Sequence, residues 1–233
     1  MTEIGYGYGS EWHLLRYLGY HRNNLSEKVL GLVGPGTIEW IDFNFSDKNE
    51  PLNRDQELKG LEFFSGNEEV MDKWKSFWPQ TGNAQNWDAI GRIDYGDHKE
   101  WLLVEAKAHI GEIISSCGAS EESKAIIRSA LEKTQAAFGS NQPVKNWMNQ
   151  YYQYANRLAM IYFLMKECDQ PVKARLLFIY FYGDQREKVK CPQNEMEWRE
   201  SITRIHNSLG INENSELMAR VHHLYLSTNP KVV

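Results

Sequence analysis

Two acidic side chains and one lysine lie beside or within apolar runs of the chain between residues 86 and 112. Asp88 precedes one apolar run, and Glu105 and Lys107 lie at the end of a second run, WLLVEAKA. Charged groups in such a segment are costly to bury unless they are paired or bind a metal ion. Two carboxylates facing one lysine leave excess negative charge, which a divalent cation would neutralise. A structural ion network of the three side chains is the alternative.

A β-hairpin is predicted to bring these three side chains together. Residues 87–95 and 100–108 are rich in aromatic, aliphatic and β-branched side chains, and residues 96–99, GDHK, have the composition of a short hairpin loop. Every second position from 102 to 108 is Leu, Val or Ala. That face suits packing against a helix, and positions 105 and 107 therefore lie on the opposite face.

The loop decides which residues of the two strands face each other. In the simplest register Tyr95 pairs with Glu100. Asp88 then lies opposite Lys107, with Glu105 a diagonal neighbour on the same face. Diagonal neighbours are about 7–8 Å apart, so the carboxylates of Asp88 and Glu105 are expected to reach one cation.

Asp88 followed by Glu105-Ala106-Lys107 resembles the D…(D/E)xK signature of the PD-(D/E)XK nuclease superfamily. The apolar run before the Glu and the helix-rich segment after it agree with that signature, while Trp87 stands where the namesake Pro would be. Further along, Gln150 and Tyr154 match the Q-x-x-x-Y helix motif of the exonuclease branch of the superfamily. The resemblance covers roughly residues 67–183.

This resemblance implies an α/β fold with a restriction-endonuclease-like core, in which helices flank a mixed central sheet that contains the antiparallel hairpin. Residues 67–233 would form the nuclease core, and residues 1–66 would add helices and a strand packed on it, within one globular domain. The first core helix, predicted at 67–78, offers Glu69 as a further metal ligand. Acids in the first turn of a helix also simply complement the helix dipole, so both roles stay open.

The resemblance also implies a reaction, the Mg²⁺-dependent hydrolysis of phosphodiester bonds in nucleic acid, DNA above all, with Mn²⁺ as an alternative ion. Asp88, Glu105 and the Ala106 carbonyl would ligate the metal. Lys107 would orient the attacking water or stabilise the charge that develops on the phosphate. The implied catalytic residues are Asp88, Glu105, Lys107, Gln150 and Tyr154.

Two predicted helices carry candidate contacts to nucleic acid. In the helix at 120–138, Lys124 and Arg128 lie one turn apart and could meet a phosphate backbone, although such pairs are usually a solvated surface. The helix at 146–167 has an amide-rich face that includes Gln153 and Arg157. Such a face suits a cleft wall that hydrogen-bonds a ligand, and a polar contact between helices is an equal alternative.

Periodicity and capping residues predict the remaining elements. Helices are expected at residues 10–18, with Ser10 as N-cap, at 24–33 and at 194–210. Strands are expected at 37–45, 174–182 and 222–227, and residues 46–60 are expected to form an exposed loop.

The composition limits the classes of protein to which this chain can belong. The chain has 233 residues, of which 42% are hydrophobic, so it can bury a sizeable core, and its net charge of −5 argues against a surface covered with Lys and Arg. Its 3 cysteines show no CxxC spacing, which favours a reducing cytoplasm over a disulfide framework. The N-terminal residues lack a signal-peptide pattern, and the longest apolar run is too short to span a bilayer.

The function predicted from the sequence is therefore a metal-dependent nuclease with nucleic acid as its partner and no membrane partner; a homodimer stays open. The alternative is a non-catalytic protein of the same fold, a DNA-binding or protein-interaction module that keeps the charged cluster as a structural ion network. A thiol site at Cys117 and His109 lacks a group to orient the base. His222 and His223 lack zinc-ligand spacing, because adjacent strand residues point to opposite faces.

Overall fold

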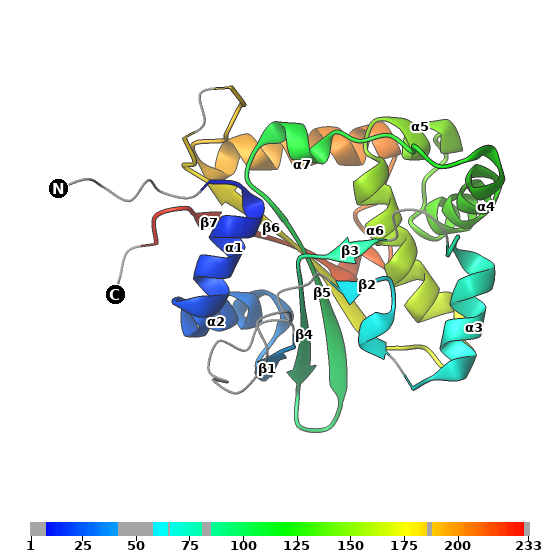
Figure 1. Cartoon of the computed structure of the whole chain (residues 1–233), viewed down its shortest axis with the longest axis horizontal. Helices are drawn as coiled ribbons and strands as arrows, with labels where there is room; N and C mark the ends of the chain where they lie inside the picture. Colours follow the sequence, from blue (N-terminus) through cyan, green and yellow to red (C-terminus); the bar gives the residue numbers. More distant parts are fainter. Residues whose placement is uncertain (1–7, 42–57, 65, 81–84, 186–187, 231–233) are drawn as a thin grey trace.

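A five-stranded mixed sheet, in the order β1-β4-β5-β6-β7, forms the centre of the α/β fold (Figure 1). The computed structural model describes residues 8–41, 58–64, 66–80, 85–185 and 188–230. Strands β1, β4 and β5 pair antiparallel, whereas β5, β6 and β7 pair parallel. The strands are β1 (Thr37–Trp40), β4 (Ala89–Asp94), β5 (Lys99–Lys107), β6 (Ala174–Tyr182) and β7 (Val221–Ser227), and a second, two-stranded sheet joins β2 (Leu58–Lys59) to β3 (Asn86–Trp87).

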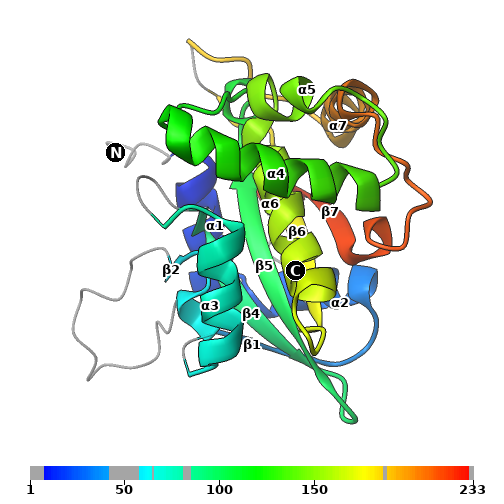
Figure 2. The same ribbon diagram turned by 90° about the vertical axis from the view of Figure 1, so that its right-hand side faces the viewer.

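Helices cover both faces of the sheet (Figures 1 and 2). One face carries α1 (Ser10–Gly19) and α2 (Arg22–Val33). The core on the other face is built with α3 (Glu68–Phe77), α4 (Glu121–Ala137), α5 (Val144–Asn149), α6 (Tyr152–Tyr162) and α7 (Glu195–Leu209). The short helical turns are η2 (Glu62–Phe64), η3 (Ile110–Ile113), the π-helical η4 (Phe163–Glu167) and η5 (Met218–Arg220). The prediction of a mixed sheet flanked by helices is confirmed.

The alternation of side chains in β5 separates the two cores. Leu102, Val104 and Ala106 are buried with α1 and α2, whereas Leu103 is buried with the helices of the other face. Glu105 and Lys107 therefore point to the face of α6, as the sequence predicted. β6 pairs with a strand on each side and is covered on both faces, which is why all of it except Arg175 is apolar.

The predicted hairpin register is wrong by two residues. Asp94, and not Tyr95, closes the ladder, paired with Lys99, and Glu100 lies opposite Ile93. The reason is a tighter turn, in which the Tyr95 N–H donates to the His98 carbonyl at 3.0 Å and Gly96 has a φ of 92°. Because the error is an even number of residues, every side chain keeps its predicted face.

The predicted helix at 146–167 is broken in the structure. It divides into α5 and α6 because Ser115, from the segment after the hairpin, inserts between them. The Ser115 N–H donates to the Gln150 carbonyl at 2.9 Å, and the Tyr152 N–H donates to the Ser115 carbonyl at 3.1 Å. These bonds replace helical ones, so Gln150 lies at the break rather than in a helix interior.

The other predicted elements are confirmed apart from their ends. Asn67, Ser120 and Asn194 cap α3, α4 and α7 through their side chains, and Gly210 ends α7 in the left-handed conformation. Ser10 is not a cap, since Gly9 occupies that position. Of the predicted strand at 37–45, residues 37–40 form β1, and residues 42–45 lie outside the described residues. Of the predicted loop at 46–60, residues 46–57 lie outside them, and Leu58–Lys59 form β2 rather than loop. No helix in the described ranges is long and apolar enough to cross a membrane.

The hairpin turn provides the first test. Gly96 has a φ of 92°, and no atom lies within 4 Å of the position that an added methyl group would take, so Gly96→Ala meets backbone strain but no clash. We expect it to lower the free energy of unfolding by about 1–3 kcal/mol, measured by urea denaturation. Gly118→Ala is the control, because Gly118 also has open space around it and an ordinary φ. Equal stabilities of the two variants would contradict the assigned turn.

Candidate active site

Glu105 is a carboxylate buried at the centre of the candidate site, with 1% of its surface exposed. Its Oε1 accepts a hydrogen bond from the Lys107 ammonium. Its Oε2 accepts from Arg157 Nε at 2.8 Å and lies 2.7 Å from Arg157 Nη2. Two cations thus hold one carboxylate. Burial raises the pKa of Glu105, but the two cations lower it by more, so the pKa lies below its ordinary value.

Arg157 reaches this cluster from α6 and is itself buried, with 3% of its surface exposed. Nη1 donates to Asn156 Oδ1 at 2.9 Å, Nη2 donates to the Asn86 carbonyl at 2.6 Å, and the guanidinium lies over the Trp87 ring, 4.8 Å from its centroid. Arg157 therefore links α6 to β3 and β5 in the interior of the protein. The sequence predicted it as a contact to nucleic acid, and in the structure its donors are turned inward.

Asp88 lies just before β4, beside Glu105. Its Oδ2 accepts the Ala106 N–H at 2.6 Å, and its own N–H donates to the Val104 carbonyl at 3.1 Å. Burial, and next the negative charge of Glu105, raise the pKa of Asp88 to about 7, although Lys107 opposes the shift. The carboxyl group is thus held where its charge is unfavourable, which is the condition that a bound cation would relieve.

Arg157 changes the charge balance predicted from the sequence. Asp88 and Glu105 carry two negative charges, and Lys107 and Arg157 carry two positive ones. The excess negative charge expected from one lysine is therefore absent among the described residues of the cluster. A metal ion is not required for neutrality, so the case for one rests on the unfavourably placed carboxyl of Asp88.

The Lys107 and Glu105 side chains line a pocket together with residues of α6 and β6. Gln153 and Tyr154 contribute to its wall, as expected for a helix bordering the hairpin. The lining residues are Glu105, Lys107, Glu112, Ile113, Gln153, Tyr154, Phe178 and Tyr180.

Of the two glutamines predicted to line the cleft, Gln153 does so and Gln150 does not. Gln150 is exposed at the break between α5 and α6, whereas Gln153 lines the pocket and its N–H donates to Ser115 Oγ at 2.8 Å. Gln153 precedes Arg157 by one helical turn, so both lie on the face that meets Glu105. That spacing is a signal in the sequence for choosing Gln153.

Tyr154 is buried in the pocket wall, and its hydroxyl points toward α7. The ring stacks on Phe178 with centroids 4.5 Å apart, and the hydroxyl lies 2.7 Å from His206 Nε2. His206 Nδ1 lies 2.9 Å from Glu213 Oε1. Burial raises the pKa of Tyr154 well above its ordinary value. No sequence signal points to His206 and Glu213, because both are distant from Tyr154 along the chain, His206 by 52 residues.

Glu112 is a second pocket residue that the sequence did not single out as functional. Its carboxylate accepts the Ala108 N–H at 2.5 Å, the His109 N–H at 3.2 Å and the Ser10 hydroxyl at 3.0 Å. These bonds fix the turn after β5 and join it to α1. In the sequence, the one signal for Glu112 is its position three residues after His109, which fits an acid that caps this turn.

The remaining candidates lie on the surface. Lys124 of α4 donates to Glu121 at 2.8 Å and Arg128 is exposed. Glu69 is exposed in the first turn of α3, next to Lys73, and does not line the pocket of Lys107.

The oxygen donors that could hold a metal ion are the Asp88 and Glu105 carboxylates and the Ala106 carbonyl. The Ala106 carbonyl belongs to the residue whose N–H meets Asp88, which keeps the backbone of residue 106 close to that carboxylate. An all-oxygen set suits Mg²⁺ or Mn²⁺. No group of three or more His, Cys, Asp or Glu side chains in the described ranges is arranged to hold a metal, so the backbone carbonyl would have to complete the set.

Compared with protein-family models, with curated proteins and with solved structures, the chain matches none of them.

Asp88→Asn tests the unfavourable placement of Asp88. A carboxyl group whose pKa rises on folding stabilises the folded state only while it is protonated. In the presence of a chelator, the stability of the wild type relative to Asp88→Asn should therefore fall as the pH rises from about 4, the ordinary pKa of Asp, to about 7. Urea denaturation at several pH values measures this difference. Parallel stability curves would contradict the raised pKa.

Arg157→Met tests the tie to Glu105. The variant keeps an apolar stem over Trp87 but leaves Lys107 as the one cation on a buried carboxylate, so the free energy of unfolding should drop by about 3–5 kcal/mol. Arg128→Met, on the exposed face of α4, is the control and should change it by less than about 0.5 kcal/mol. Thermal and urea unfolding measure both. A loss below about 1 kcal/mol for Arg157→Met would show that the buried pair is not a structural requirement.

Proposed function

We propose that this chain hydrolyses phosphodiester bonds of nucleic acid, DNA above all, in a reaction that depends on Mg²⁺ or Mn²⁺. One observation carries the proposal. Asp88, with a pKa raised to about 7, lies beside Glu105 and Lys107 at the open end of the β4–β5 hairpin. A carboxyl group with a strongly raised pKa, beside a second carboxylate and a lysine, is typical of active sites.

The arrangement of the strands supports a restriction-endonuclease-like core as the finer description of the fold. An antiparallel hairpin, β4–β5, carries the acids, and β5 continues into a parallel pair with β6 after the crossover through α4, α5 and α6. This is the mixed sheet that the D…ExK resemblance implies. Helix α3 precedes the hairpin, as expected for a first core helix.

Asp88, Glu105 and the Ala106 carbonyl would hold the metal ion. When bound, the ion would polarise the scissile phosphate and lower the pKa of a coordinated water. A cation beside Asp88 would also stabilise its charged form.

Lys107 would act on the phosphate or on the attacking water. Its ammonium contacts Glu105, and 8% of its surface is exposed at the pocket. A cation held by a buried carboxylate is preorganised to stabilise charge that develops on the phosphate oxygens. Gln153, in the same wall, offers an amide that can orient a phosphate or a base edge. Tyr154 would position the wall through its stack on Phe178, since its hydroxyl faces His206.

A second candidate function is a non-catalytic module for binding DNA or a protein. The observation that favours it is Arg157, which makes the cluster neutral without a metal ion. In that case the acids and cations join α6 to the hairpin, and function lies elsewhere on the surface.

Cleavage assays separate the two candidates. We expect the purified protein to cleave labelled single- or double-stranded oligonucleotides with Mg²⁺ or Mn²⁺, and Asp88→Asn to lose about 10²-fold or more in rate while remaining folded. Lys75→Met is the control, because Lys75 is exposed on α3 and pairs with Asp72. Gln153→Ala should lose more activity than Gln150→Ala. No cleavage of any substrate, with no effect of Mg²⁺ on the melting temperature, would favour the module.

A further inference from the structure

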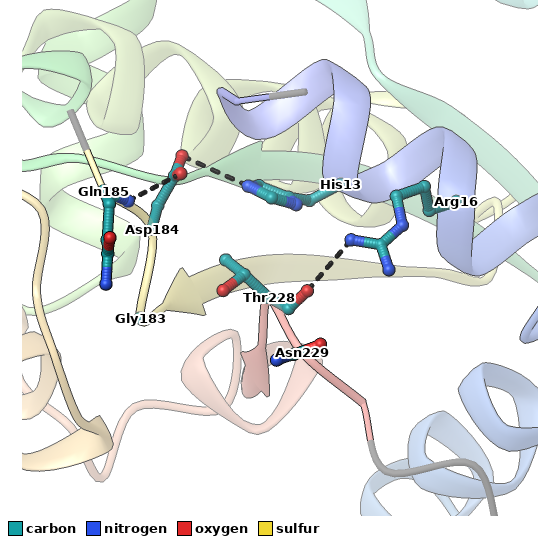
Figure 3. Close-up of a pocket in the computed structure, with 7 residues that line it drawn as sticks. All are labelled: His13, Arg16, Gly183, Asp184, Gln185, Thr228 and Asn229. Atoms are coloured by element: carbon teal, nitrogen blue, oxygen red, sulfur yellow. Dashed lines mark hydrogen bonds and ion pairs between the residues drawn. The ribbon is translucent and has the colours of Figure 1, made fainter. Parts of the chain in front are cut away.

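A second pocket lies beside α1 (Figure 3), and α1 packs on the face of the sheet opposite to that of Lys107. It is formed where α1 crosses the carboxyl ends of the parallel strands β6 and β7. In open α/β sheets, this edge is where ligands bind. The lining residues are His13, Arg16, Gly183, Asp184, Gln185, Thr228 and Asn229, and we call this site the α1 pocket.

Arg16 supplies a guanidinium to the α1 pocket. Its Nη1 donates to the Thr228 carbonyl at 3.0 Å. Among the residues that the structure describes, Arg16 forms no ion pair with a carboxylate. Guanidinium has five N–H donors in a planar fork, and a half-buried fork that faces a pocket without a carboxylate partner suits an oxyanion.

The two ring nitrogens of His13 are buried. The side chain is 3% exposed, and its Nε2 lies 3.1 Å from Asp184 Oδ2. Within the described ranges, neither Nδ1 nor Nε2 has a hydrogen-bonding partner, and the contact of Nε2 with Asp184 is a close approach only. A buried polar atom without a partner is unfavourable, and the His13 side chain that carries these atoms lines the α1 pocket.

Asp184 also lines the α1 pocket, but its carboxylate is held away from Arg16 by hydrogen bonds on its own side. Oδ2 accepts the Gly9 N–H at 3.0 Å and faces His13, and Oδ1 accepts the Gln185 N–H at 2.9 Å. Figure 3 shows Asp184 turned toward His13 and Gln185, while Arg16 reaches the other side of the pocket at Thr228. The guanidinium is therefore the positive group that a ligand can meet on the Thr228 side of the pocket, away from the Asp184 oxygens.

We propose that the α1 pocket binds a phosphate group, with Arg16 as its principal contact and the Asn229 and Gln185 amides at its rim. The donors come from three separate segments, namely α1, the turn after β6 and the end of β7. A tetrahedral oxyanion can address donors on several sides, whereas a planar carboxylate presents two oxygens in one direction. The phosphate can be free or part of a nucleotide, since the same contacts serve both.

Titration of the whole chain with inorganic phosphate, at constant ionic strength and followed by calorimetry, tests the proposal. We expect saturable binding of one phosphate per chain, weakened at least tenfold in Arg16→Gln. Arg92→Gln is the matched control and should bind as the wild type does, because Arg92 lies on β4 and pairs with Glu39. A parallel titration with a nucleoside 5′-monophosphate identifies the source, and tighter binding of either ligand supports the site.

Asn229→Asp provides a test that does not depend on how well Arg16→Gln folds. Asn229 is exposed, so the substitution adds a negative charge at the rim without disturbing the core, and phosphate binding should weaken severalfold. The proposal is overturned if the wild type shows no saturable binding, or if both variants bind as the wild type does. Asp88→Asn, which is expected to remain folded and to lose cleavage, should leave the titration unchanged, so this result is independent of the nuclease assay.

Discussion

The buried carboxylate of Glu105 is the constraint on which the rest of the structure depends. One charged group inside a sheet is tolerated only with close counter-charges, and here they come from its own strand, through Lys107, and from α6, through Arg157. Arg157 in turn holds the Asn86 carbonyl and covers Trp87. The position of α6 over the hairpin is thus fixed by charge as well as by apolar contacts, and the pocket wall follows from that position.

Much of the fold could be predicted because its signals are local. The apolar run of β6, the Asn194 cap and the Gly210 stop of α7 act through residues adjacent in sequence. The register of the hairpin was missed because it depends on where the turn closes, and Gly96 allows more than one closure. The break before α6 was missed because Ser115, far from Gln150 along the chain, causes it. Periodicity carries no information about such a contact.

The candidate site could be predicted in part for the same reason. A shift of the strand register by an even number of residues leaves every side chain on the same face of the sheet. The alternation of side chains is therefore sufficient to place Asp88, Glu105 and Lys107 on one face. The role of Arg157 was not evident, because an arginine on an amide-rich helix face fits both a ligand contact and an internal ion pair. Only the packing of α6 on β5 separates these interpretations, and it turns the guanidinium toward Glu105.

The cluster of Asp88, Glu105, Lys107 and Arg157 is already neutral, and this limits how a metal ion could bind there. Both oxygens of Glu105 are occupied by cations, so a metal ion would share this carboxylate with Lys107 and Arg157 or displace one of them. Because the pKa of Asp88 lies near 7, a cation bound beside it would replace a proton in the neutral range, where Glu105 stays charged. Asp88 is consequently the residue through which proton binding, any metal binding and the free energy of unfolding would be linked. The charge on Glu105 maintains the architecture, and the charge on Asp88 is the one free to change during function.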